Sequence, residues 1–142
     1  MNTELMFSSK NQCWETPKRL FDQLNNEFHF TLDPCSSHEN HKCDNYYTIE
    51  DDGLSQDWSG EIVFVNPPYG GELKLWVKKC FEEWTRGTTI VMLIPARTDT
   101  QYFHEYILPC AEIRFLKGRI KFEQNGIATN PAPFPSMIVI YK

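Results

Sequence analysis

One short stretch of the chain combines an amide, two prolines and an aromatic ring: Asn66, Pro67, Pro68 and Tyr69. It follows directly on the apolar run Ile62–Val65, whose β-branched and aromatic residues are typical of a buried parallel strand. Prolines cannot donate hydrogen bonds to a neighbouring strand, so the strand ends here and the chain turns out at its carboxyl end. Ligands of open α/β sheets bind at this edge.

The groups in this tetrapeptide suit an exocyclic amino group on a flat ring. The Asn66 side-chain oxygen and the Pro67 carbonyl can accept two amino hydrogens, while the ring of Tyr69 stacks on the substrate. Such groups position the nitrogen and stabilise charge that develops on it. A plain turn is the alternative, but it would not require an amide before the prolines and an aromatic ring after them.

The tetrapeptide resembles the D/N-P-P-Y/F signature of S-adenosylmethionine-dependent amino-methyltransferases, which act on adenine N6, cytosine N4 or a protein glutamine. Further segments stand in the order seen in the phage DNA N6-adenine methyltransferase (Dam-like) family: Trp14–Pro17, Leu32–Cys35, Asp51–Leu54, Pro95–Thr100 and Lys117–Arg119. This resemblance covers nearly the whole chain after the first ten residues. It implies S-adenosylmethionine as cofactor, double-stranded DNA as partner and a catalytic role for the whole tetrapeptide.

The resemblance also implies which residues bind the cofactor. They fall in four segments and comprise Trp14, Thr16, Pro17, Asp33, Pro34, Cys35, Asp52 and Asn66. The Asp33 carboxylate would lie near the positive end of the cofactor, and that of Asp52 near its adenine amino group. The sequence departs from the usual D-P-F-x-G-x-G loop, because Cys35-Ser36-Ser37 contains no glycine. Alternatively, Asp52 belongs to an exposed acidic turn. No acidic residue clearly matches the one that binds the ribose hydroxyls in this resemblance, and Asp44 and Asp51 are the candidates.

Charge is distributed unevenly along the chain, whose net charge is −5. Residues 1–65 carry a net charge of −8, whereas residues 69–121 carry +3. A basic second half could face phosphates, although ordinary solvated faces would give the same composition. We expect Tyr69, Arg97, Arg119 and Lys121 to contact the substrate, with Lys117–Arg119 and Phe122 forming a hairpin that faces DNA.

Cys35, His38, His41 and Cys43 are all residue types that bind zinc. Their spacing lacks the usual pairing of two cysteines and then two histidines, and Cys35 also belongs to the cofactor segment. We therefore expect free thiols and solvated histidines here and no metal site.

The order of expected elements alternates between helices and strands. Thr16 and Pro17 predict the cap and first position of a helix that runs to about Phe28. Apolar spacing predicts a second helix over residues 73–84, closed by Gly87, and a third from Thr98 or Asp99 to about Leu108. Strands are expected at residues 30–32, 46–50, 62–65, 89–94, 113–116, 119–123 and 137–141.

This alternation predicts an α/β fold with a mostly parallel sheet and an antiparallel edge. Together with the resemblance, it implies a compact Rossmann-like class I methyltransferase fold in which the polar middle section, residues 34–60, is shortened. We expect a flexible arm at residues 1–12 and a single methyltransferase domain at residues 13–142. An odd number of cysteines and the lack of a leader or a membrane span favour the cytosol of a bacterium or a phage-infected cell.

The function implied is methylation of adenine N6 in DNA by a site-specific, adenine-specific methyltransferase. The target base would leave the duplex and stack on Tyr69, whose ring rather than hydroxyl would supply the contact. Two alternatives stay open. One is amino-methylation of cytosine, RNA or a protein glutamine. The other is a degenerate methyltransferase that binds DNA or a partner without catalysis, which the missing glycines would suit.

Overall fold

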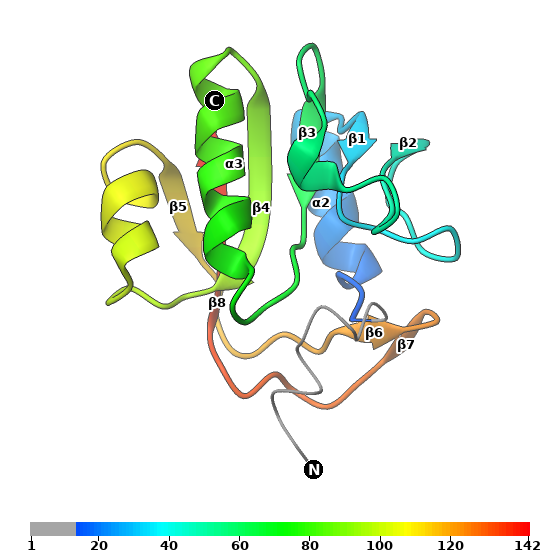
Figure 1. Ribbon diagram of the computed structural model, residues 1–142. Coiled ribbons are helices and arrows are strands. Elements are labelled where there is room, and N and C mark those ends of the chain that lie inside the picture. Colours follow the sequence, from blue (N-terminus) through cyan, green and yellow to red (C-terminus); the bar gives the residue numbers. More distant parts are fainter. Residues whose placement is uncertain (1–13) are drawn as a thin grey trace.

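The sheet is built around two parallel strands, β3 (Ile62–Val65) and β4 (Thr89–Pro95), in the computed structural model, which describes residues 14–142. Two short strands, β1 (Leu32–Asp33) and β2 (Asn45–Tyr46), extend the sheet in parallel on the far side of β3 (Figure 1). The arm predicted at residues 1–12 lies outside the described residues.

The other edge of the sheet is antiparallel. Strand β8 (Ser136–Tyr141) pairs with β4 and with β5 (Glu112–Phe115), antiparallel to both. The full strand order is β2-β1-β3-β4-β8-β5. The predicted α/β fold, with a mostly parallel sheet and an antiparallel edge, is confirmed, and the strand order is consistent with the compact Rossmann-like fold that the sequence predicts.

Side chains of the central strands alternate between two apolar layers. Figure 1 shows α3 (Leu73–Thr85) in front of the sheet and α2 (Lys18–Phe28) behind it. Each fully buried aliphatic or aromatic side chain stabilises such a layer by about 1.5–3 kcal/mol. The α3 layer contains Val63, Val65, Ile90, Met92, Met137 and Val139, and the α2 layer contains Phe64, Val91, Leu93, Ile138 and Ile140.

The start of α2 differs from the prediction. Pro17, not Thr16, occupies the cap position, and neither side chain caps the helix. Instead, the Lys18 backbone N–H donates to Oε1 of Glu123, 3.3 Å away and 105 residues later in the chain. A carboxylate at this position satisfies one of the free N–H groups of the first turn and complements the helix dipole. A tertiary contact therefore replaces the expected local cap.

The middle section is as short as predicted. Between β1 and β3 the chain forms only β2 and the 3-10 turn η1 (Gly53–Ser55). The third predicted helix is reduced to a helical stretch that ends in the π-helical turn η2 (Phe103–Ile107), and its first turn is held by Thr100, whose Oγ1 accepts from the Phe103 N–H. Neither Thr98 nor Asp99 supplies this bond.

The strand predicted at residues 119–123 is wrong. Only Glu123 and Gln124 form a strand, β6 (Glu123–Gln124), which pairs with β7 (Ile127–Ala128) as a hairpin apart from the main sheet (Figure 1). Asn125 and Gly126 both have positive φ, the conformation that a tight two-residue hairpin turn requires. The hairpin therefore lies further along the chain than expected.

A buried carboxylate joins α3 to the loop before β3. Glu83 is fully buried, and its Oε1 accepts from Lys79 Nζ (2.8 Å) and from the Trp58 N–H (3.3 Å). The Trp58 indole N–H in turn donates to the Gly53 carbonyl (3.1 Å). Glu83 thereby anchors the segment that contains η1.

We expect Glu83→Ala to lower the free energy of unfolding by about 2–4 kcal/mol, because it leaves Lys79 and the Trp58 N–H without their buried acceptor. Chemical denaturation measures this change. Glu82→Ala, one position earlier and exposed, is the control and should change stability by less than about 0.5 kcal/mol. Equal effects of the two substitutions would contradict the anchoring role.

Candidate functional site

A pocket lies where the connections of two adjacent parallel strands diverge. After β1 the chain continues to β2, toward one edge of the sheet, whereas after β3 it continues to β4, toward the other edge. Such a switch point leaves a crevice at the carboxyl ends of the strands, where ligands of open α/β sheets bind. The pocket is open to solvent and encloses about 450 Å³ of space, part of which is bulk solvent. Its lining comes from the loop after β1 (Pro34, Cys35, Ser36), the segment after β2 (Thr48, Ile49, Asp52, Gly53, Leu54), and Pro68, Glu72 and Trp76.

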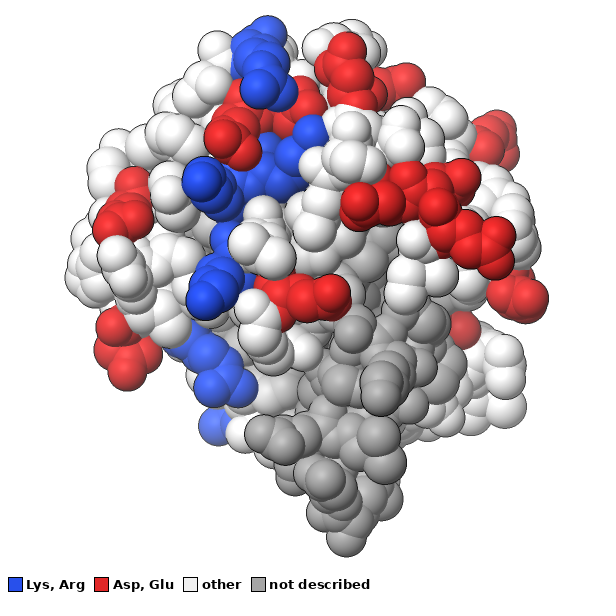
Figure 2. All heavy atoms as spheres, in the orientation of Figure 1, with Lys and Arg blue, Asp and Glu red and all other residues white. Residues whose placement is uncertain are grey.

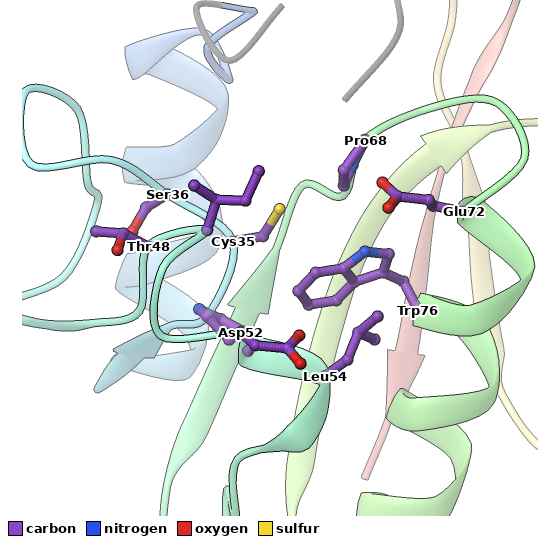
Figure 3. A pocket seen from close by; sticks show the side chains of 11 residues that line it. Cys35, Ser36, Thr48, Asp52, Leu54, Pro68, Glu72 and Trp76 are labelled. Atoms are coloured by element: carbon purple, nitrogen blue, oxygen red, sulfur yellow. The ribbon is translucent and has the colours of Figure 1, made fainter. Parts of the chain in front are cut away.

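The pocket combines apolar walls with two carboxylates. Figure 3 shows the Trp76 indole facing the space between Leu54 and Pro68. The side chains of Asp52 and Glu72 both reach this space, from opposite walls. A ligand with a flat ring in one part and a positive charge in another matches this arrangement. The indole offers area for stacking on the ring, and the carboxylates offer negative charge.

The pocket wall depends on a close approach at Gly53. A Cβ atom at this position would lie 2.2 Å from the Pro34 carbonyl oxygen and 3.0 Å from the Trp76 ring. Only glycine lets these two walls meet. The Cys35–Ser37 loop contains no glycine, so the one glycine of the pocket lining is Gly53.

Asp33 lies beneath the loop that follows β1 rather than among the residues that line the pocket. Its carboxylate accepts from the backbone N–H groups of Lys42 (2.9 Å) and Cys35 (3.4 Å). Burial raises its pKa from 3.8 to about 7 despite these two bonds. The side chain therefore shapes the loop that carries Pro34 and Cys35, and its contact with a cofactor stays a prediction.

The amide of Asn66 is held on both sides. Its Nδ2 donates to the Trp14 carbonyl (3.2 Å), and its Oδ1 accepts from the Tyr69 hydroxyl (3.0 Å). Asn66 is only half-buried, so its oxygen keeps a lone pair for a further donor. The amide stands ready as an acceptor at the carboxyl end of β3.

Tyr69 packs between the two apolar layers. Its ring meets Phe122 and Phe134 edge-on, with centroid distances of 6.0 and 5.6 Å. Its hydroxyl also lies 3.3 Å from the Leu93 carbonyl, and burial raises the pKa of this phenol, which keeps it a neutral donor. The hydroxyl, which we expected to be dispensable, thus contacts the amide of Asn66.

The N-terminal segment reaches the Asn66–Tyr69 motif through its backbone. Glu15 and Glu123 exchange two backbone hydrogen bonds of 2.9 and 3.0 Å, which brings the β6–β7 hairpin beside Trp14 and hence beside Asn66. Thr16 is buried and Pro17 half-buried, but neither lines the pocket. Their predicted contact with a cofactor is therefore untested.

The predicted substrate-binding cations are all exposed: Arg97, Arg119 and Lys121. Figure 2 shows a stripe of Lys and Arg that runs over α3 toward the carboxyl edge of the sheet, while Asp and Glu gather on the side of β1 and β2. Arg114 is paired with Glu27 and Glu112 through contacts of 2.7 Å. Phe122, expected on a DNA-facing hairpin, is instead buried against Tyr69.

The cysteine and histidine segment forms other contacts. His41 stacks on Tyr46 at 3.8 Å, and His38 Nδ1 lies 2.9 Å from the Tyr46 hydroxyl. Burial raises the pKa of the Cys43 thiol to about 12. Within residues 14–142, no group of three or more His, Cys, Asp or Glu side chains is arranged to hold a metal ion.

Comparison with known proteins identifies the family. Residues 3–142 match the sequence model described as DNA N-6-adenine-methyltransferase (Dam). The chain belongs to this family. The predicted family and enzyme class, an adenine-specific DNA methyltransferase, are thereby confirmed.

Two phage proteins are among the similar sequences. The DNA N-6-adenine-methyltransferase of Haemophilus phage HP1 (strain HP1c1) is 30% identical over 139 residues, which cover 94% of this chain and 80% of the HP1 protein. The protein of the same description from Escherichia phage T1 is 30% identical over 115 residues, which cover 80% of this chain and 48% of the T1 protein. In the described part of this member of the family, no helix is long and apolar enough to cross a membrane.

Of the residues predicted to bind cofactor, Pro34, Cys35 and Asp52 line the pocket. Sequence reasoning missed Trp76 on α3 and Glu72 at its cap position, and also Ile49 and Leu54. The spacing of Trp76 places it on the apolar side of its helix, which indicates a core residue and not a pocket residue. Glu72 directly precedes that helix and follows the tetrapeptide by three residues, which could have indicated its place.

We expect Gly53→Ala to disrupt the pocket wall and to lower the free energy of unfolding by about 1–3 kcal/mol, the usual cost of overpacking. Gly71→Ala is the matched control, since a Cβ there meets nothing within 4 Å. Denaturation curves of both variants measure the effect. A Gly53→Ala protein as stable as the Gly71→Ala protein would show that the two walls can separate freely.

Asp33 should make stability depend on pH. Its pKa is 3.8 in the unfolded chain and about 7 in the folded protein, so between these values the native state binds the proton more tightly. The free energy of unfolding should therefore fall as the pH rises from about 4 to about 7 and level off above. Subtracting the curve of Asp33→Asn from that of the wild type isolates this contribution. A flat difference across this range would contradict the assignment.

Proposed function

We propose that this chain transfers the methyl group of S-adenosylmethionine to N6 of an adenine in double-stranded DNA, with Asn66 as the central catalytic residue. The observation that carries the proposal is the position of Asn66. It follows β3 with its amide oxygen available, beside a pocket at the switch point of the sheet. Family membership supports the same reaction.

The pocket at the switch point suits the cofactor. S-adenosylmethionine, when bound, supplies an electrophilic methyl group on a positive sulfur. Trp76, Leu54 and the 72% exposed Ile49 offer apolar contact area to its adenine ring. Glu72 and Asp52 supply the negative charge that favours a cationic ligand. Cys35 stays a neutral thiol, because burial raises its pKa.

Asn66 and Pro67 would hold the reacting amino group. The amide oxygen of Asn66 and the carbonyl of Pro67 accept its hydrogens, which fixes the direction of the nitrogen lone pair and stabilises the charge that develops on transfer. Neither group is a strong base. Pro68 forms part of the pocket lining, so the tetrapeptide joins the cofactor pocket to the acceptor site.

A duplex hides adenine N6, so the base has to leave the stack to reach Asn66. Tyr69 supplies an aromatic surface at this point, and its hydroxyl contributes by holding the Asn66 oxygen. Arg97, Arg119 and Lys121 are exposed and could contact phosphates. The β6–β7 hairpin, with Ile127 72% exposed, adds a surface for the duplex beside the same edge.

The test is incubation of the protein with methyl-labelled S-adenosylmethionine and duplex DNA, followed by nucleoside analysis. We expect the label in N6-methyladenine. Label in cytosine, or only in RNA or protein, would show that adenine in DNA is not the substrate. Absence of cofactor binding in calorimetry would indicate a non-catalytic protein.

We expect Asn66→Ala to bind S-adenosylmethionine with nearly unchanged affinity but to lose at least about two orders of magnitude in turnover, as on removal of one key polar stabiliser. Calorimetry measures the first quantity and single-turnover transfer the second. Asn26→Ala, an exposed asparagine of α2, is the control for handling and folding. Turnover of Asn66→Ala close to that of this control would remove Asn66 from the reaction.

A further inference from the structure

The orientation of the Asn66 amide is decided by a group that can only accept. A backbone carbonyl has no hydrogen to donate, so the side-chain atom that faces the Trp14 oxygen must be nitrogen. The amide oxygen is thereby turned to the other side, where the Tyr69 hydroxyl donates to it. The Trp14 carbonyl thus selects which end of the amide is presented as acceptor.

The Trp14 carbonyl owes its position to the residue that follows it. Glu15 is paired through its backbone with Glu123, and its side chain, 9% exposed, accepts from the Asn125 N–H in the hairpin turn (2.9 Å). The carboxylate of Glu123 accepts a further hydrogen bond, from the Lys18 N–H at the start of α2. The two glutamates therefore clamp the N-terminal segment, the hairpin and the start of α2 together.

We infer that Glu15 is a positioning residue for methyl transfer: by holding the β6–β7 hairpin against the N-terminal segment, it keeps the Trp14 carbonyl where it orients the Asn66 amide. This inference rests on the proposed function. Glu15 is not among the residues that line the pocket, and its carboxylate accepts from the Asn125 N–H, so we expect it to act through Asn66.

The same geometry makes position 66 specific for asparagine in this chain. An aspartate would place an acceptor oxygen opposite the Trp14 carbonyl, and two acceptors without a hydrogen between them repel each other. The D/N-P-P-Y/F signature admits either residue. Here the clamp makes Asn66→Asp unfavourable unless the N-terminal segment can move away.

The test combines substitutions at both positions in steady-state assays with labelled S-adenosylmethionine and duplex DNA. We expect Glu15→Ala to lower kcat at least about tenfold, with the KM of the cofactor unchanged within about twofold, because a small misplacement of a catalytic group is costly. Glu15→Gln, which keeps an acceptor oxygen for the Asn125 N–H, should restore most of kcat. Asn66→Asp should also lose activity.

The double variant distinguishes positioning from general damage. In the Asn66→Asp background, Glu15→Ala should lower kcat less than about twofold or raise it, because freeing the N-terminal segment relieves the repulsion. Glu61→Ala is the control, since Glu61 accepts from Asn45 at the amino end of β3, away from the site. An equal tenfold loss in both backgrounds, full activity of Asn66→Asp or no rescue by Glu15→Gln would overturn the inference.

A readout independent of catalysis separates this inference from the proposed function. NMR of the side-chain amide should show faster hydrogen exchange at Asn66 Nδ2 in Glu15→Ala than in the wild type or in Glu61→Ala. Unchanged exchange would overturn the positioning role even if DNA is methylated. If the wild type methylates no adenine but exchange at Asn66 Nδ2 is still faster in Glu15→Ala than in the wild type, only the proposed function is contradicted.

Discussion

The divergence of the connections after β1 and β3 is the constraint on which the site depends. The two strands are neighbours and run in parallel, yet the chain leaves them toward opposite sides of the sheet. Their carboxyl ends therefore cannot be covered by one connection, and a crevice is left between the Pro34 loop and Pro68. Gly53 narrows this crevice by touching the Pro34 carbonyl, and Glu83 fixes the loop that carries Gly53. The shape of the pocket is therefore determined by the strand order and by the contacts of Gly53 and Glu83.

The proposed acceptor site is built differently from the pocket. Its central group, the Asn66 amide, is held by contacts from distant parts of the chain, because Trp14 lies 52 residues away. The N-terminal segment keeps its position through Glu15 and Glu123. Substrate contact at the β6–β7 hairpin would consequently act on the same clamp that holds the amide. The pocket at the switch point would be far less affected, since no residue of the clamp lines it.

The sequence predicted well those elements whose pattern is local. β3, β4, β8 and α3 follow from apolar periodicity and from the residues that end them, and the motif at Asn66 follows from its place after a strand. Most errors concern contacts between distant residues, since no local pattern indicates that Glu123 caps α2 or that Phe122 packs against Tyr69. The hairpin turn is an exception, because Asn125-Gly126 is a local turn signal that the prediction overlooked.

The candidate site shows the same division. Pro34, Cys35 and Asp52 were predicted from motifs and line the pocket, whereas Glu72 and Trp76 reach it only because α3 packs across the crevice. Asp33 carries the expected residue type at the expected strand end, but its carboxylate serves the Cys35 and Lys42 backbone. Motif reading identified the segments at the site. It could not tell which side chains face the ligand.

The central claim is that the switch-point pocket presents the cofactor to Asn66. A crystal structure of the protein with S-adenosylhomocysteine, the product that remains after transfer, tests it most directly. The account predicts electron density between the Pro34–Ser36 loop and Trp76, with the sulfur directed toward the Asn66 amide. Density on another face of the molecule, or a sulfur that points away from Asn66, would contradict the account.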